Sequence, residues 1–206
     1  MSDGILLHEY AASGNCYKVR LTAAMAGVRL DRREYDIMNG ETRTPEFLAK
    51  VNANGRIPVL QVGDRFIPES NAACYYVADG SSLIPTDRFQ HADMLRWMFF
   101  EQYNHEPNIA TLRFWMRSVG ADKLSDLERL QMPAKRRAGN AALRLMDDHL
   151  KSREWLVGEQ LSLADICLFA YTHVAGEADF DLRLYPHVLE WIARIGDQPN
   201  FLPMVA

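Results

Sequence analysis

The first eighty residues alternate between short apolar runs and amphipathic stretches, a pattern typical of alternating strands and helices. Residues 5–7 (ILL) predict a strand buried on both faces, and a helix is expected to follow up to Ala26, with Gly27 at its C-terminal cap. The remaining pattern predicts a strand over 33–37, a short helix opened by Thr44 and Pro45, extended runs over 57–62 and 65–67, and a helix over 70–78. The pair Gly63-Asp64 between the extended runs predicts a hairpin turn. This order predicts a small mixed sheet with helices packed on it.

Strand patterns end at a turn-rich segment, residues 79–86 (DGSSLIPT), and only helical spacing follows it. About five helices are expected, over 89–102, 109–119, 134–150, 163–175 and 186–195. Pro107 is expected to interrupt the helical pattern after the first of them. The predicted fold class is therefore an α/β N-terminal domain followed by an all-α C-terminal domain. We expect the first domain over 1–79, a linker over 80–86 and the helical domain over 87–206.

Composition and charge narrow the possible partners and the compartment. The 206 residues carry a formal charge of −4, which disfavours nucleic acid as a partner. No apolar run approaches the roughly 18 residues needed to span a bilayer, and the N-terminus does not resemble a signal peptide. The three cysteines are too few and too scattered for a disulfide framework. We therefore expect a reduced, cytoplasmic protein that binds neither nucleic acid nor membrane.

Common catalytic signatures are absent from the sequence. The six histidines include no pair at i, i+4, so we expect no helix-borne metal site. There is also no phosphate-binding Gly-Lys-Ser/Thr loop, no Gly-x-Gly-x-x-Gly and no Gly-x-Ser-x-Gly elbow. Covalent serine hydrolysis is therefore disfavoured.

The loop after the first strand is the first candidate site. Ser13-Gly14-Asn15-Cys16 leads directly into a helix, where amide N–H groups and the positive end of the helix dipole favour an anion such as a thiolate. Helix capping by Ser13 or Asn15 is the alternative interpretation. The spacing is that of a Cys-x-x-Cys redox motif whose first, nucleophilic cysteine is replaced by serine, which disfavours dithiol chemistry. Cys16 is then expected to be packed rather than reactive.

Two further segments have a possible binding role. A cis bond between Ile57 and Pro58, at the start of the hairpin, would turn the backbone of Ile57 outward to pair with an extended peptide. Glu69 and Ser70 stand immediately before a helix. They fit an ordinary helix start with a complementary acid, and they equally fit a site for the amine and carboxylate of a ligand.

The combination of these motifs resembles the cytosolic glutathione S-transferases over nearly the whole chain, most closely their bacterial serine- or asparagine-type members. The resemblance rests on SGNCYKVRL (13–21), NANGRIPVLQ (52–61), PESNA (68–72) and VGEQLSLADICLFAY (157–171). It implies a thioredoxin-like N-terminal domain, an all-helical C-terminal domain, a homodimer, glutathione as co-substrate and a role in detoxification. The box formed by Ser162 and Asp165 is structural in that family, so we expect no catalytic role for it.

Carried over onto matching positions, the resemblance implies how glutathione would be activated and held. Ser13 lies where serine-type members keep the hydroxyl that stabilises the glutathione thiolate, and Asn15 lies where one bacterial group uses an asparagine amide. In tyrosine-type members a catalytic tyrosine stands at the position that Glu9 occupies here. Tyr10 comes one residue later, so it is expected to line the substrate pocket instead. The implied binding contacts are the backbone of Ile57 before a cis Pro58 for the cysteinyl unit, Glu69 and Ser70 for the γ-glutamyl amine and carboxylate, and Arg56 for the glycyl end.

The second domain is expected to supply the remaining apolar wall of the substrate pocket. Its candidates are Trp97, Phe100, Tyr103 and Trp115, although their helical spacing equally fits a core role. The implied function is a glutathione transferase whose bound thiolate attacks a small hydrophobic electrophile. Two alternatives stay open: a glutathione-dependent disulfide or peroxide reductase, and a non-catalytic member of the family that binds ligands or docks to other subunits.

Overall fold

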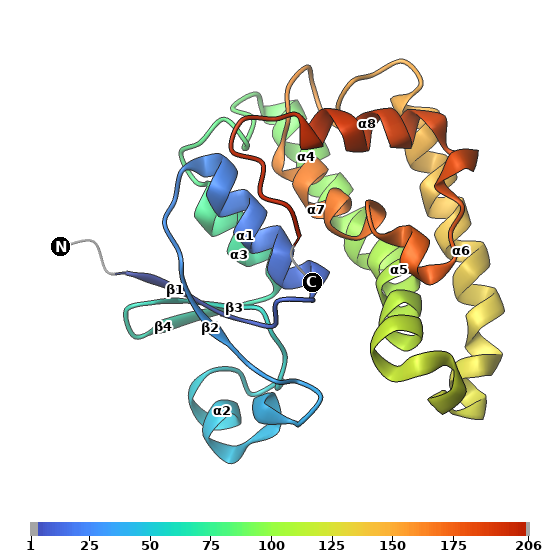
Figure 1. The fold of residues 1–206 in the computed structure, drawn as a ribbon. Coiled ribbons are helices and arrows are strands. Elements are labelled where there is room, and N and C mark those ends of the chain that lie inside the picture. The colour runs from blue at the N-terminus through green and yellow to red at the C-terminus, as the bar shows by residue number, and fades with distance from the viewer. Residues whose placement is uncertain (1–3, 205–206) are drawn as a thin grey trace. The chain divides into compact units, whose positions relative to one another are not determined.

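The computed structural model describes residues 4–204, which form two compact units (Figure 1). Unit 1 contains the chain up to Ile84 and the segment from Pro199, and unit 2 contains Pro85–Gln198. The sequence assigns the segment from Pro199 to the helical domain, whereas the structure groups it with unit 1. The hydroxyl of Tyr17 in unit 1 donates a hydrogen bond to the Leu202 carbonyl at 2.7 Å, which ties this segment down.

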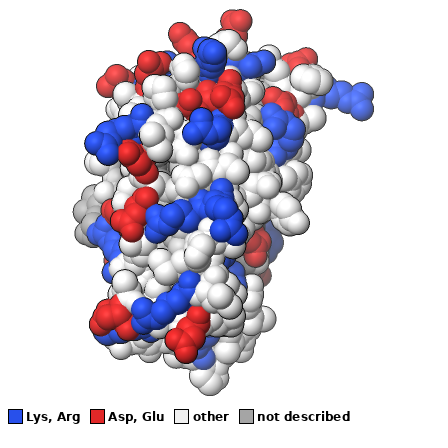
Figure 2. All heavy atoms as spheres, turned by 90° about the vertical axis from the view of Figure 1, so that its right-hand side faces the viewer, with Lys and Arg blue, Asp and Glu red and all other residues white. Residues whose placement is uncertain are grey.

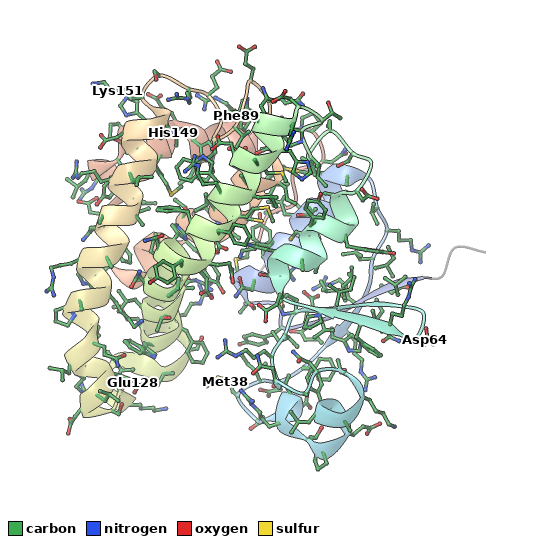
Figure 3. All side chains as sticks on the ribbon, turned by 180° about the vertical axis from the view of Figure 1, so that it is seen from behind. Met38, Asp64, Phe89, Glu128, His149 and Lys151 are labelled. Carbon is green, nitrogen blue, oxygen red and sulfur yellow. The ribbon has the colours of Figure 1, made fainter. Side chains whose placement is uncertain are left out.

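Unit 1 is built on a four-stranded mixed sheet in the order β2-β1-β3-β4. The strands are β1 (Ile5–Glu9), β2 (Asp31–Glu34), β3 (Val59–Val62) and β4 (Arg65–Pro68). Strand β1 runs parallel to β2 and antiparallel to β3, and β3 pairs with β4 across the turn Gly63-Asp64. Gly63 has a φ of 61°, as the predicted turn requires at its first position, and Figure 3 shows Asp64 at the tip of this hairpin. The predicted mixed sheet is confirmed.

Strand β2 begins and ends earlier than the predicted strand over 33–37. All four of its residues are exposed, so its sequence carries no alternation between buried and exposed positions. The Asp36 carboxylate accepts hydrogen bonds from the backbone N–H groups of Met38 at 3.0 Å and Asn39 at 3.1 Å. This local turn takes the chain out of the sheet, because aspartate side chains compete with the ladder for backbone donors.

The helices of unit 1 are α1 (Gly14–Ala26), α2 (Pro45–Lys50) and α3 (Ser70–Ala78), with a 3₁₀ turn at Glu41–Arg43. Gly27 ends α1 in the left-handed conformation, as predicted, with a φ of 68°. Helices α1 and α3 pack on one face of the sheet and α2 lies on the other (Figure 1). The arrangement fits a thioredoxin-like fold, and it brings the N-terminal ends of α1 and α3 together.

Unit 2 is helical, as predicted. It consists of α4 (Arg88–Phe100), a π-helical segment Glu101–His105, α5 (Glu106–Arg113), a second π-helical segment Phe114–Gly120, α6 (Asp126–Leu150), α7 (Leu163–Thr172) and α8 (Pro186–Gly196), with 3₁₀ turns at Ala121–Lys123, Ala175–Ala178 and Leu182–Leu184. Figure 3 shows His149 of α6 on the side facing α4, where its ring packs edge-on against Trp97 with centroids 4.8 Å apart.

Helices α5 and α6 of unit 2 both begin earlier than predicted. Helix α6 begins at Asp126 rather than near 134, because Ser125 and Glu128 form a reciprocal capping box. Pro133 therefore lies inside α6. Pro107 does not interrupt the chain either, because it occupies the first turn of α5, where a missing backbone N–H is tolerated.

Charged side chains of both signs are interspersed on the face drawn in Figure 2, with uncharged surface between them. Many charges of unit 2 pair locally: Arg113 and Arg117 both contact Glu177, and Arg136 contacts Asp179 at 3.5 Å. Within residues 4–204, no helix has the length and apolar character needed to cross a membrane.

Candidate active site

Ser13 is the N-cap of α1, so the capping interpretation of this residue is confirmed. Its backbone is extended, and its hydroxyl oxygen accepts a hydrogen bond from the Cys16 N–H at 3.3 Å. A hydroxyl accepts through a lone pair and donates through its own proton. Capping therefore leaves Ser13 able to donate a hydrogen bond to an anion at the start of the helix.

Cys16 is fully buried in α1. The Tyr10 N–H lies 3.4 Å from its sulfur, and burial raises the pKa of the thiol to about 12. Burial therefore disfavours the thiolate, which is the nucleophilic form of cysteine. The expectation that Cys16 is packed is confirmed.

Asn15 and Ser70 connect the N-terminal ends of α1 and α3. The Ser70 hydroxyl donates a hydrogen bond to the Asn15 side-chain oxygen at 3.2 Å. Ser70 is buried and Asn15 is half-buried. The structure thus brings together three of the predicted site residues, Ser13, Asn15 and Ser70, where two helix N-termini converge.

Glu69 has an unusual backbone conformation, with a φ of 72° and a ψ of 116°. A glutamate in this region costs on the order of 1–3 kcal/mol, and such strain concentrates at binding sites. Its side chain is exposed, and its carbonyl accepts the Ala73 N–H at 3.0 Å. The sequence gives no sign of this conformation, because glutamate is not a residue that favours positive φ.

The Ile57–Pro58 peptide bond is cis, as the family resemblance implied. Pro58 is buried and Ile57 is half-buried, and the ladder of β3 begins only at Val59. Arg56 is exposed, and its carbonyl accepts a hydrogen bond from the Asn52 side chain at 2.9 Å. The loop before the hairpin is therefore held from within, while the Arg56 side chain extends from its surface.

Glu9 belongs to a buried charge cluster at the end of β1. Its carboxylate is fully buried and pairs with Arg20 at 3.3 Å and with Arg32. The Arg20 guanidinium also donates to the Ala11 carbonyl at 2.8 Å, which holds the loop that leads to Ser13. Glu9 therefore has a structural role as the partner of two arginines. The sequence does not reveal these ion pairs, because neither arginine is a near neighbour of Glu9 in the chain.

The aromatic candidates of unit 2 differ in exposure. Trp97 and Trp115 are buried, Phe100 is half-buried and packs edge-on against Trp97 at 5.3 Å, and Tyr103 is 84% exposed. Tyr10 of unit 1 is half-buried. Burial of the two tryptophans fits the core alternative, and the assignment of all five residues to a substrate pocket stays a prediction. Among residues 4–204, no group of three or more His, Cys, Asp or Glu side chains is arranged to hold a metal ion.

Comparison with known proteins places the chain in one family. The N-terminal domain of the glutathione S-transferases matches residues 6–79, and their C-terminal domain matches residues 109–199. The crystal structure of a possible glutathione S-transferase from Rhodopseudomonas palustris is 42% identical, covers 97% of this chain and 89% of that chain, and gives a TM-score of 0.91. A glutathione S-transferase from Pseudomonas fluorescens is 39% identical, with 98% and 99% covered and a TM-score of 0.91.

The chain therefore belongs to the glutathione S-transferase family, and the predicted family is confirmed. A curated relative, elongation factor 1-gamma 3 from Oryza sativa subsp. japonica, is 30% identical over an alignment of 207 positions, which covers 98% of this chain and 48% of that protein. The chain thus spans about half the length of this elongation factor relative.

Proposed function

We propose that the chain is a glutathione transferase that binds glutathione in unit 1 and stabilises its thiolate with Ser13 and Asn15. The observation that carries the proposal is the convergence of Ser13, Asn15 and Ser70 at the N-terminal ends of α1 and α3. A free thiol with a pKa near 8.5 is only about 3% ionised at pH 7. Lowering that pKa by two units requires roughly 2.7 kcal/mol. One charge-assisted hydrogen bond contributes about 1.5–3 kcal/mol, so a hydroxyl and a helix N-terminus are sufficient.

The proposed reaction is nucleophilic attack by the bound thiolate on an electrophilic carbon. The sulfur–carbon bond forms as the leaving group departs with its electron pair, or as the electrons move into a conjugated acceptor. The electrophile would be held by apolar side chains, for which the candidates remain Tyr10 in unit 1 and, separately, Trp97, Phe100, Tyr103 and Trp115 in unit 2. The test is a panel of aryl halides, epoxides and conjugated carbonyls assayed with glutathione. The reductase alternative would be favoured if no electrophile of the panel were turned over while a mixed disulfide or a peroxide was reduced rapidly.

Glutathione would lie extended along the loop before β3, pairing with the backbone of Ile57 beside Pro58, with Arg56 at its glycyl end and Ser70 at its γ-glutamyl carboxylate. Glu69 would pair with the γ-glutamyl amine. We expect Glu69→Ala to raise the dissociation constant for glutathione about tenfold, because an ionic hydrogen bond worth about 1.5 kcal/mol is lost. Alanine has no greater freedom at positive φ than glutamate, so the substitution isolates the carboxylate.

Isothermal titration calorimetry with glutathione measures this effect. Glu46→Ala is the matched control, because Glu46 is an exposed acid of the same unit that pairs with Lys50. A dissociation constant that is the same in Glu69→Ala and the unmodified protein would remove Glu69 from the proposed site.

The relation to elongation factor 1-gamma supports a second candidate, a domain that docks to other subunits without catalysis. The presence of Ser13, Arg56, Pro58, Glu69 and Ser70 together supports the enzyme. The two functions differ in one measurable property, because a docking domain has no need of glutathione. The docking function would be favoured if titration of the unmodified chain with glutathione gave no heat and the electrophile panel gave no turnover.

We also propose that the chain is cytoplasmic and forms a homodimer, as the family resemblance implies. Two large side chains on α4 support a contact surface: Phe89 is 80% exposed and Phe99 is 71% exposed. We expect Phe99→Glu to shift the chain from dimer toward monomer, because a charge buried in an apolar interface is costly. Sedimentation equilibrium measures the mass. Leu130→Glu is the control, since Leu130 is equally exposed on α6; a dimer unaffected by Phe99→Glu contradicts this surface.

A further inference from the structure

Lys18 is a fully buried lysine on α1, one turn beyond Asn15. Lysine is almost never fully buried, because its ammonium loses its hydration and needs acceptors in return. Two side chains at the start of α3 provide them: the ammonium nitrogen lies 3.3 Å from the Ser70 hydroxyl oxygen and 3.1 Å from the Asn71 side-chain oxygen. The Lys18 ammonium group therefore lies at the N-terminal end of α3, beside the Ser70 hydroxyl.

The directions of these hydrogen bonds follow from the chemistry of the donors. An ammonium group can only donate, so the Ser70 oxygen accepts from Lys18. The single Ser70 proton is then turned away from the ammonium, toward the Asn15 side-chain oxygen at 3.2 Å. An amide whose oxygen is held on one side presents its two N–H donors on the other. The chain from Lys18 through Ser70 thus selects one of the two orientations of the Asn15 amide.

We infer that Lys18 is a positioning residue, which acts through Ser70 to hold the Asn15 amide with its N–H donors toward the thiolate of bound glutathione. The inference rests on the proposed function and assigns to Asn15 a donor that it would lack if its amide were reversed. It also divides the work of Ser70. The hydroxyl serves Asn15, and the backbone N–H at the first position of α3 remains the group for a ligand carboxylate.

The test compares Lys18→Met, Ser70→Ala and the double variant. The readout is the pKa of enzyme-bound glutathione, measured from the ultraviolet absorbance of the thiolate as a function of pH. Each single variant is expected to raise this pKa by about one unit, which is tenfold less thiolate at a pH below it. The double variant is expected to show no further increase, because both changes break the same chain. Lys50→Met, at an exposed lysine of α2, controls for the loss of a positive charge.

Three results would overturn the inference: an unchanged thiol pKa in folded Lys18→Met, an unchanged pKa in Ser70→Ala, or additive shifts in the double variant. Additive shifts would mean that Lys18 acts as a distant charge and not through Ser70. If Lys18→Met does not fold by circular dichroism, Ser70→Ala decides alone, since it removes only a hydroxyl. Failure of the proposed function gives a different result, because the unmodified protein would then bind no glutathione or leave its thiol pKa at the solution value.

Discussion

Asp165→Ala is expected to lower the free energy of unfolding by about 3–5 kcal/mol, the range measured when one partner of a buried charged network is removed. The Asp165 carboxylate is fully buried at the start of α7. One of its oxygens accepts the Leu156 N–H and the Trp191 indole N–H, each at 2.9 Å. The other accepts the Ser162 N–H at 2.9 Å and the Ser162 hydroxyl at 2.8 Å. Alanine leaves these buried donors without an acceptor, and it removes a contact shared by three segments of unit 2.

Urea unfolding followed by circular dichroism measures this loss. Asp181→Ala is the matched control, because Asp181 caps a short turn in the same unit and pairs with Arg183 at the surface. We expect a much smaller loss of stability for Asp181→Ala, because its partners are exposed to solvent. Asp165→Asn is expected to fall between the two, because its oxygen keeps one pair of donors while its amide N–H groups face the other. Equal stability of the position 165 and position 181 alanine variants would contradict the role given to this network.

The elements of unit 1 could be predicted largely because their ends carry local signals. Thr44 and Pro45 open α2, Gly27 closes α1, and Gly63 fixes the hairpin, each through chemistry that involves only near neighbours in the chain. Strand β2 was misplaced because all of its side chains are exposed, so no periodic signal marks it. The start of α6 was missed because the sequence prediction used the apolar spacing after 134, whereas the capping box of Ser125 and Glu128 opens the helix at Asp126.

The residues of the candidate site also differ in whether a local sequence signal marks them. Ser13 and Asn15 were found because they stand at a strand-to-helix turn, and Ser70 because it begins a helix. The role of Lys18 depends on Ser70, 52 positions away, so no local pattern reveals it. A lysine within the otherwise packed stretch of α1 was a signal that could have been followed, because a charge on a buried helix face needs a partner.

The state of the three cysteines indicates which sulfur atom reacts under the proposed function. Cys16, Cys74 and Cys167 are all buried and none forms a disulfide. Burial raises the pKa of Cys16, which moves this thiol away from nucleophilic chemistry. Under the proposed function, the sulfur that reacts is therefore the thiol of glutathione, and the residues of the chain supply hydrogen bonds to it.

Ser13→Ala is accordingly expected to lower kcat about ten- to a hundredfold while the dissociation constant for glutathione changes little. The hydroxyl would donate to the thiolate, and its loss leaves the Asn15 amide and the helix N-terminus as the remaining stabilising groups. The pKa of the bound thiol should rise with the loss of rate, so raising the pH should restore part of the activity. Steady-state kinetics with an active electrophile, measured across pH, tests both expectations.

The substitution also removes a helix cap, which costs about 1 kcal/mol of stability and needs its own control. Ser125→Ala supplies it, because the Ser125 hydroxyl accepts the Glu128 N–H at 3.3 Å, the same distance as between Ser13 and the Cys16 N–H. A similar loss of stability in both variants, with a loss of rate only at position 13, would separate catalysis from capping. A Ser13→Ala rate equal to that of the unmodified protein would instead assign thiolate stabilisation to Asn15, whose amide orientation then becomes the decisive feature of the site.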